Sequence, residues 1–350
     1  MPIDMVHPGN GLTLNQGTGL EGETNATHGL SPDFRYIIGG LKQKCPQNKR
    51  LGLGDLLSGV GGHRGPCAAN RYVRAPVRDT AKFSRWVKEQ NSDAELDRNW
   101  VVLSAQPVIE ISGYTIKSSL TRGKSFDMML CGGIIRALRQ MEVDRLVVPL
   151  GSTARHYTPV EWASIAMYGA TTELVVDAFD PPPSQIRLDD RTLVMCMVHL
   201  GATWSCYAVD FAKRALTVMD PLITSPNDND NDNAIIQMHG NNAPRLLSQV
   251  IYCMQQHTGN SSIGNGYWEK ILLTAPDEET LCHGQASSIY ALNFARWFNG
   301  TTVCNPIGNK PILAQSKKEL LLLIIQCTIN NGQKPSYFDR IAELQDLLEE

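Results

Sequence analysis

Residues 192–222, TLVMCMVHLGATWSCYAVDFAKRALTVMDPL, predict three consecutive β-strands. A short apolar run predicts the first strand over 193–198, and regular alternation predicts the second over 204–211. The third is expected over 215–219, with Lys213 and Arg214 in a tight hairpin turn before it. This strand stops at Asp220, before a proline. A carboxylate is therefore expected at a strand end where several segments converge, which is a common place for functional side chains.

The size and composition of the chain set the limits on its class. Its 350 residues are 42% hydrophobic and 19% charged, which is enough for a sizeable core in one large domain or two small ones. The net charge of -3 predicts no general attraction to nucleic acid or to a membrane surface. The longest aliphatic run, 320–325, is too short to cross a bilayer, and the first residues do not form a signal peptide.

The nine cysteines bear on compartment and on metals. Their spacing matches neither a disulfide framework nor paired zinc-binding motifs. We therefore expect a reducing, intracellular environment, nuclear or cytoplasmic, and we expect no cofactor and no metal. The aspartates at 228, 230 and 232 have the spacing of a calcium loop, but the required Gly and Glu are missing, so a solvated insertion is expected there.

Two regions are predicted from the change in composition along the chain. Residues 1–95 are rich in Gly, Asn, Pro and Arg, and are expected to be a mostly disordered or irregular extension with one or two short helices. A basic cluster at 42–50 is either a solvated loop or a nuclear address. Order is expected to begin near Trp100, within a folded domain over 96–350.

The elements of that domain follow from local pattern. Strands are predicted over 100–103, 108–111 and 268–274, and helices over 126–141, 243–257, 317–328 and 337–349. Ser125 is the expected N-cap of the helix over 126–141. Thr158-Pro159-Val160-Glu161 reads as a capping box that begins a helix ending at Tyr168.

The order of apolar strand, Trp-led strand, basic turn and strand ending in Asp-Pro-Leu resembles the core of the ubiquitin-like protease family. These are SUMO-specific, sentrin-type cysteine peptidases, and the sequence looks most like their degenerate, transposon-associated plant branch. The resemblance extends over about 100–300 and implies an α+β, papain-like fold, with a central mixed or antiparallel sheet flanked by helices. It also implies a partner, SUMO or another ubiquitin-like modifier, which a helix introduced by residues like Phe126-Asp127 helps to grip.

Matching the family's catalytic residues to this sequence reveals substitutions. In active members a His precedes the Trp, an Asp ends the second hairpin strand, and an Asp-Cys-Gly begins a later helix. This sequence keeps Trp204 and Asp220 but has Thr203 at the His position. With residues 283–290 aligned on Gly284 and Ile289-Tyr290, Ser287 takes the Cys position. Ala286 then stands for the Asp, Ser288 for the Gly, and Leu281 for the oxyanion Gln.

These substitutions remove the chemistry that a cysteine peptidase needs. The nucleophile is a thiolate made available by an oriented imidazole. Thr203 cannot accept a proton near neutral pH, and Ser287 without a base keeps its hydroxyl proton. Loss of one triad member costs ~10⁴-fold in rate or more. The resemblance therefore implies that the fold is kept and that the chain is a pseudoenzyme.

Three other interpretations remain open. The first is an active peptidase that cleaves after a Gly-Gly tail with a displaced triad, His199, Asp220 and Cys282, which occur in the family's order. A second is a modifier-binding module without catalysis, since Trp204 covers the Gly-Gly tail in active members. The last is a zinc site made by Cys196, His199 and the pair Cys282-His283.

Overall fold

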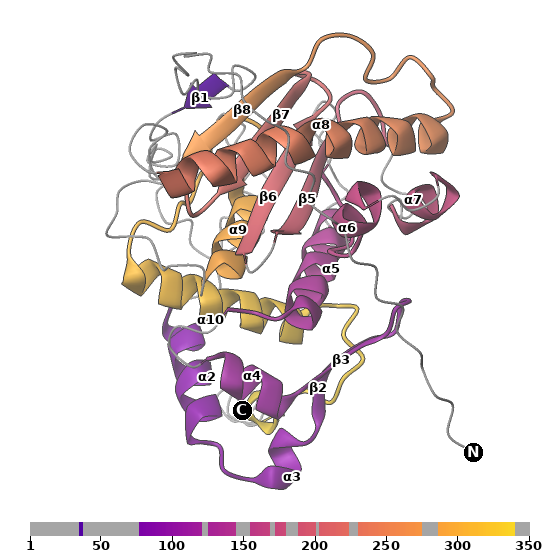
Figure 1. Ribbon diagram of the computed structural model, residues 1–350. Coiled ribbons are helices and arrows are strands. Elements are labelled where there is room, and N and C mark those ends of the chain that lie inside the picture. The colour runs from indigo at the N-terminus through magenta and orange to yellow at the C-terminus, as the bar shows by residue number, and fades with distance from the viewer. Residues whose placement is uncertain are drawn as a thin grey trace, which may run out of the picture.

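The computed structural model describes residues 35–37, 77–120, 125–144, 155–168, 172–179, 188–200, 203–223, 230–274 and 286–339. A six-stranded sheet occupies the upper part of the molecule in Figure 1, with helices on both of its faces. A smaller sheet and several short helices form the lower part.

The large sheet is mixed, with the strand order β1-β8-β7-β6-β5-β4. Its three central strands, β5, β6 and β7, are antiparallel, whereas the outer pairs β4·β5, β7·β8 and β1·β8 are parallel. The strand bounds are β1 Arg35–Ile37, β4 Arg155–Tyr157, β5 Leu193–Leu200, β6 Thr203–Asp210, β7 Ala215–Asp220 and β8 Glu269–Thr274. The three strands predicted from residues 192–222 are confirmed, and Arg214, with φ of 51°, lies in the turn between β6 and β7.

Each face of the sheet is covered by its own set of helices. Because side chains alternate along a strand, Cys206 and Met219 face one core while Tyr207 and Val218 face the other. The first core is covered by α5 Met128–Asp144, α9 Ser287–Trp297 and α10 Lys310–Gln326. The second is covered by α6 Trp162–Met167, α7 Thr172–Ala178 and α8 Asp230–Thr258. This arrangement of helices around a mixed sheet confirms the α+β expectation.

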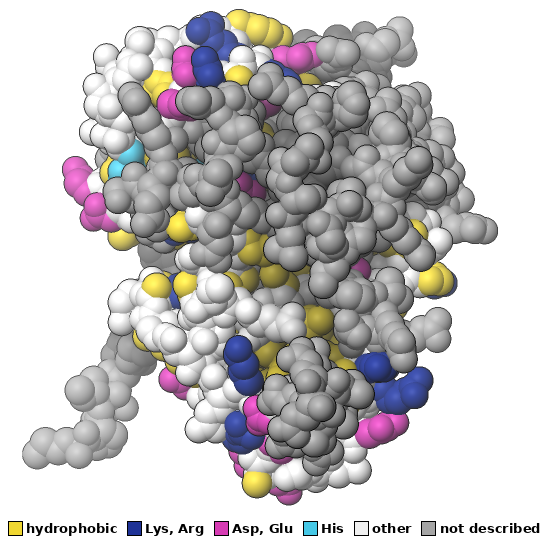
Figure 2. All heavy atoms as spheres, turned by 180° about the vertical axis from the view of Figure 1, so that it is seen from behind, with side chains coloured by type: hydrophobic (Ala, Val, Ile, Leu, Met, Phe, Trp, Pro, Cys, Tyr) yellow, Lys and Arg dark blue, Asp and Glu magenta, His cyan; other side chains and the backbone are white. Residues whose placement is uncertain are grey.

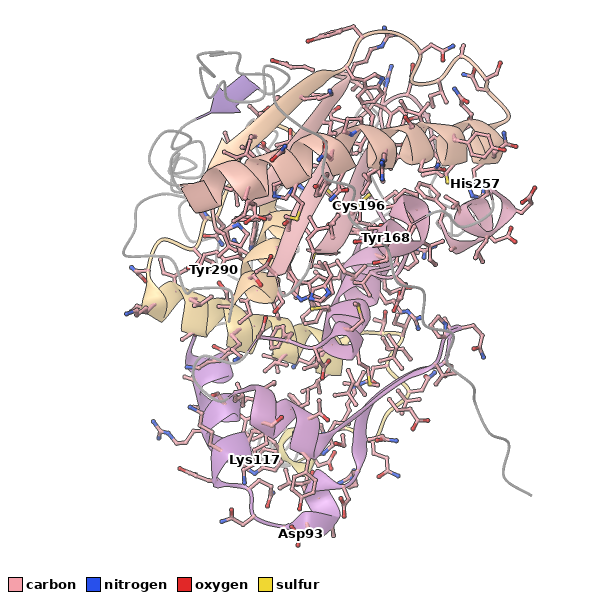
Figure 3. The ribbon with its side chains drawn as sticks, in the orientation of Figure 1. Asp93, Lys117, Tyr168, Cys196, His257 and Tyr290 are labelled. Carbon is pink, nitrogen blue, oxygen red and sulfur yellow. The ribbon has the colours of Figure 1, made fainter. Side chains whose placement is uncertain are left out.

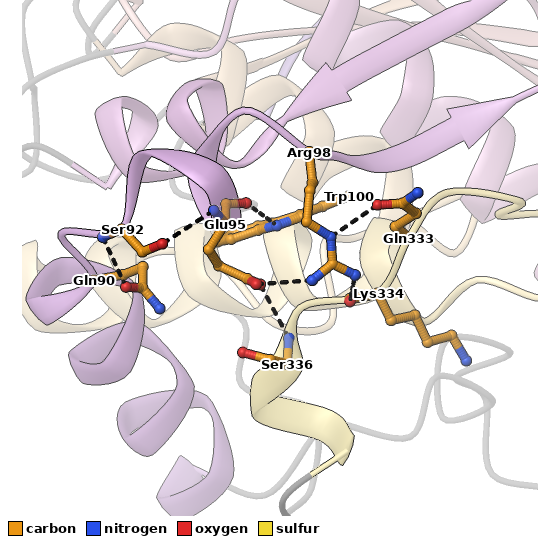
Figure 4. A network of polar contacts seen from close by, with 8 residues as sticks. All are labelled: Gln90, Ser92, Glu95, Arg98, Trp100, Gln333, Lys334 and Ser336. Carbon is orange, nitrogen blue, oxygen red and sulfur yellow. Dashed lines mark hydrogen bonds and ion pairs between the residues drawn. The ribbon is translucent and has the colours of Figure 1, made fainter.

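The lower part contains an antiparallel pair, β2 Asn99–Leu103 and β3 Ile109–Ser112, with α2 Val77–Glu89, α3 Asp93–Leu96 and α4 Gly113–Ser119. The C-terminal segment is joined to it by the polar network in Figure 4. Arg98 donates to Glu95 Oε2 at 2.7 Å and to Gln333 Oε1 at 2.8 Å. Glu95 Oε1 accepts from the Ser336 amide at 3.0 Å, so α3 holds the chain where it leaves α10.

The expectation that order begins near Trp100 is wrong. Phe83 and Val87 of α2 are fully buried in the same core as Trp100, and the ring of Trp86 lies 5.8 Å from that of Trp100. The amino-acid composition of this region did not indicate the helix, because its few apolar residues lie on one face only. A second piece of the N-terminal region, β1, pairs with β8. The predicted irregularity of the other residues before 77 concerns a part of the chain outside the described residues.

Several predicted helix ends are corrected. Ser125 does not cap α5, because the Leu130 amide donates to Asp127 Oδ1 at 2.8 Å. The capping box at 158–161 is not formed, because α6 begins at Trp162 without a side-chain cap. The helix expected from Ala243 begins at Asp230, within the Asn/Asp run, although residues 224–229 lie outside the described residues. The helix predicted over 337–349 lies mostly outside them as well.

Figure 2 shows the opposite face of the molecule, where charges of both signs are interspersed over the described residues. This distribution fits the small net charge of -3. In the described ranges, no helix is long and apolar enough to cross a membrane.

Candidate functional site

The three triad positions lie at element ends that meet at one end of the sheet. Thr203 begins β6, Asp220 ends β7, and Ser287 begins α9. The amide of Trp204 donates to Ser287 Oγ at 3.1 Å, which joins the start of α9 to the start of β6. Thr203 Oγ1 donates to the Leu200 carbonyl at 3.2 Å, so this side chain is engaged by the neighbouring strand.

Asp220 is completely buried, and both carboxylate oxygens accept hydrogen bonds. Oδ2 accepts from Ser205 Oγ at 2.5 Å and bonds to His239 Nε2 at 3.0 Å, and Oδ1 accepts from the Leu222 amide at 2.7 Å. Because Cys206 pairs with Met219, Ser205 stands opposite Asp220 on the face covered by α8. The carboxylate is thus held on that face by a strand, a helix and its own following turn.

His239 has a second partner in the same buried network. Its Nδ1 lies 2.6 Å from the hydroxyl of Tyr207, and both side chains lie in the core under α8. Burial, with the nearby Asp220 charge, raises the pKa of Tyr207 well above 10, so the phenol keeps its proton. A carboxylate only accepts, so His239 donates through Nε2 and accepts from Tyr207 through Nδ1. The accepting nitrogen of His239 therefore faces the buried hydroxyl of Tyr207, which keeps its proton.

Sequence reasoning missed His239. No motif surrounds it, and it enters the network only because α8 packs across the strands that carry Tyr207 and Asp220. The helical period of α8 gives one signal, since His239 shares an inward face with Ile236 and Ala243. A polar residue on such a face has to find a partner when it is buried.

Ser287 and Ser288 both join the start of α9 to its surroundings. Ser287 is 1% exposed, so its hydroxyl is not presented on an open surface. Ser288 is fully buried, and its Oγ accepts from the Phe126 amide at 2.8 Å and lies 2.6 Å from Ser125 Oγ. Ser288, which the resemblance matches to the family's Gly, therefore holds the segment that precedes α5. Its partner in that segment is Ser125, which was wrongly predicted as an N-cap.

Replacing Ser288 by alanine is expected to lower the free energy of unfolding by about 1–3 kcal/mol, because the buried Phe126 amide loses its acceptor. Urea unfolding followed by circular dichroism measures this change. Ser118→Ala is the matched control, since Ser118 bonds only to Thr115 on an exposed helix surface. Equal, negligible effects of the two substitutions would contradict the anchoring role of Ser288.

The fallback residues are not brought together in the described part of the chain. His199 stands opposite Trp204, with ring centroids 4.6 Å apart, on the face covered by α9. Asp220 faces the other core, so the sheet separates it from His199. Cys282 lies outside the described residues.

The zinc interpretation fails on geometry for two of its residues. Cys196 and His199 are three apart on one strand, so their side chains point to opposite faces. Cys196 lies between the sheet and α8 in Figure 3 and is fully buried, which raises its thiol pKa to about 12. In the described ranges, no group of three or more His, Cys, Asp or Glu side chains is placed to hold a metal.

Three other buried free cysteines are also poor nucleophiles. Burial raises the pKa of Cys253 to about 12 and raises those of Cys131 and Cys206 well above the ordinary value of a thiol. A thiol with such a pKa stays protonated near neutral pH, and the protonated form is inert. Cys304, by contrast, is disulfide-bonded.

The comparisons with known proteins agree with this architecture. No protein-family model matches the chain, and no curated protein matches it. The Chaetomium thermophilum Ulp1-like SUMO protease catalytic domain is similar in structure, at 8% identity and a TM-score of 0.50, over 73% of this chain and 91% of that domain. The C-terminal Ulp1 protease domain, solved in complex with the yeast orthologue of SUMO, gives 12% identity and a TM-score of 0.49, over 73% and 98%. The chain therefore has the Ulp1-like, papain-like protease fold, as the sequence predicted.

Proposed function

We propose that this chain is a non-catalytic domain of the ubiquitin-like protease type that binds SUMO or another ubiquitin-like modifier. The observation that carries the proposal is the state of Asp220. Its carboxylate is bonded to Ser205, His239 and the Leu222 amide, within a core and away from α9. In a peptidase of this fold that carboxylate would orient an imidazole toward the nucleophile.

The side chains around Asp220 support the loss of peptidase activity. The His position carries Thr203, whose hydroxyl has no basic nitrogen and is bonded to Leu200. The Cys position carries Ser287, which is buried and accepts a backbone amide hydrogen. The imidazole that does reach Asp220 belongs to His239, and both of its nitrogens are engaged. The bond between His239 and Asp220 joins α8 to the end of β7.

A binding role is supported by an exposed surface at the start of α5. Asp127 caps this helix, and Met128 and Met129 next to it are 38% and 49% exposed. Exposed methionines adapt to varied partner surfaces. The resemblance assigns modifier binding to this place, and one neighbour of the same fold was solved with the yeast orthologue of SUMO. Trp204, which is 4% exposed, stays the proposed contact for the modifier's Gly-Gly tail.

Incubation of the full chain with SUMO and ubiquitin vinyl-sulfone probes tests the catalytic half of the proposal. We expect no covalent adduct from the folded protein on a denaturing gel. The same reaction with Cys282→Ala and with Ser287→Ala locates a nucleophile if one exists. An adduct lost in the Cys282→Ala variant would instead establish the displaced-triad peptidase.

Met129→Asp tests the binding half, since a charge at an exposed apolar contact opposes burial. We expect the dissociation constant for free SUMO or ubiquitin to rise by about tenfold or more, as for a contact residue of moderate importance. Titration calorimetry on the full chain measures it.

The matched control is Leu174→Asp, whose side chain is similarly exposed at 51% but belongs to α7, one of the helices that cover the other core. It should leave the dissociation constant unchanged. Failure of both modifiers to bind the unmodified chain would overturn the binding role, whatever the probes show.

A further inference from the structure

Strand β8 would be the edge of the large sheet if β1 were removed. β1 pairs in parallel with residues 271–273 of β8, with Arg35 opposite Ile271 and Ile37 opposite Leu273. Figure 1 shows β1 on the outer side of β8, beyond the strands that carry the candidate site. The other side of β8 pairs with β7 along all six of its residues. We call the side of β8 that β1 covers the β8 edge.

The β8 edge belongs to an apolar strand buried on both faces. Leu272 is fully buried in the core under α8, and Leu273 is fully buried in the core under α9. An apolar strand whose outer N–H and C=O groups are uncovered is a template for pairing with another strand. The chain covers this one with only three residues, brought from a distant segment.

The connection makes β1 an exchangeable cover. Residues 38–76 separate it from α2, so the strand is not held by a short turn as β6 and β7 are. Closing so long a connection costs more entropy than closing a hairpin turn. Three parallel residues supply few hydrogen bonds to oppose that cost. β1 thus pairs over no more residues than β4 does, and it has the longer connection to the next element.

We propose that the β8 edge is a strand-addition site, occupied in cis by β1 and able to take the same segment from a second copy of this chain. Main-chain hydrogen bonds provide most of the affinity in such recognition. The segment that fits the edge is the one already seated there, in the register Tyr36 to Leu272. Exchange of an identical element between two copies needs no new contact. This inference is independent of the proposed modifier binding, which uses another part of the molecule.

Two proline variants of the full chain, Tyr36→Pro and Ile37→Pro, form a matched pair. Successive N–H groups of a strand point to opposite sides, so one of the two substitutions removes an N–H that faces β8. The other removes an N–H that faces away and serves as the control. The probe is a fluorescent peptide with the sequence of residues 30–42, and its binding is followed by anisotropy.

We expect one proline variant, and not the other, to bind this peptide about tenfold or more tightly than the unmodified chain, in which the tethered β1 competes. We also expect the unmodified chain to form a concentration-dependent dimer in sedimentation, and the same variant to lose it. If both variants bind the peptide equally well, or if neither variant binds it, the strand-addition site is overturned. A chain that stays monomeric at concentrations where the peptide binds would overturn exchange between copies. If the variant without the N–H that faces β8 does not fold alone, its refolding is measured with and without the peptide, and refolding that the peptide does not improve contradicts the proposal.

Discussion

Replacement of Asp220 by alanine is expected to lower the free energy of unfolding by about 4 kcal/mol, because the groups that lose it as an acceptor each cost about 1–3 kcal/mol when left unsatisfied in the interior. The side chain is fully buried, and its loss leaves His239, Ser205 and the Leu222 amide without their acceptor. Each of these groups was desolvated on folding, so none regains water when the carboxylate is removed.

Urea unfolding of Asp220→Ala, His239→Ala and the double variant measures this effect and its origin. Because the two side chains form one bonded unit, we expect the double variant to lose much less than the sum of the single losses. Asp127→Ala is a useful control, since that carboxylate is exposed and caps one helix, a contribution of about 1 kcal/mol. A loss below about 1 kcal/mol for Asp220→Ala would contradict the packing role assigned to it.

Acidification is expected to destabilise the protein through His156. This side chain is fully buried beside Phe179, and its Nε2 lies 3.3 Å from the Phe179 carbonyl. Burial, followed by the nearby charges of Arg139 and His257, lowers the pKa of His156 to about 3 from its ordinary value of 6.5, against the opposing effect of the Phe179 carbonyl. Among the described residues, Nδ1 has no hydrogen-bond partner, so a proton added there would be unsatisfied.

The sign of the pH dependence follows from the depressed pKa. The unfolded chain binds the proton near pH 6.5 and the folded chain only near pH 3, so protonation favours unfolding. Stability from this group is complete above about pH 6.5 and is lost as pH falls toward 3. The expected slope is about 1.4 kcal/mol per pH unit, or about 3 kcal/mol between pH 6.5 and pH 4.

Urea unfolding of the full chain and of His156→Gln at several pH values tests this slope. Glutamine keeps a donor for the Phe179 carbonyl but does not titrate. The difference in slope between the two proteins should equal one proton between about pH 6 and pH 4. Parallel pH profiles would show that His156 is not the group responsible.

The sequence predicted the central strands well because their signals are local. Trp204 to Phe211 alternates between two cores, and Ala215 to Asp220 follows after a turn, so period and turn chemistry agree. The α2 helix was not placed, because its buried Phe83 and Val87 are sparse among charged residues and pack against distant segments, such as Tyr337. The capping box at 158–161 was wrong because the local motif was overridden by β4, whose pairing continues into the bond from the Thr158 amide to Met195.

The sequence predicted where the candidate site residues lie along the chain, but not which side chains they bond to. Resemblance pointed to Thr203, Asp220 and Ser287, and all three lie at element ends. The Trp204 to Ser287 bond joins the first and the last of these ends, and Asp220 has other partners. Their catalytic roles, and that of Cys282, stay predictions. The displaced triad pairs His199 with Asp220, although the alternation of side chains along β5 and β7 places the two on opposite faces of the sheet.

By itself, the sequence determined the elements whose residues carry their own pattern, which are the strands over 192–222 and the alternation of their side chains. Only the tertiary structure decided what Asp220 does, because its partners Ser205 and His239 are close in space and marked by nothing local. It also decided that Arg35–Ile37 completes the sheet beside β8. The physical reason is the same in both cases. Periodicity reports which way a side chain points, whereas the partner of a buried polar group or of a strand edge is chosen by packing between distant segments.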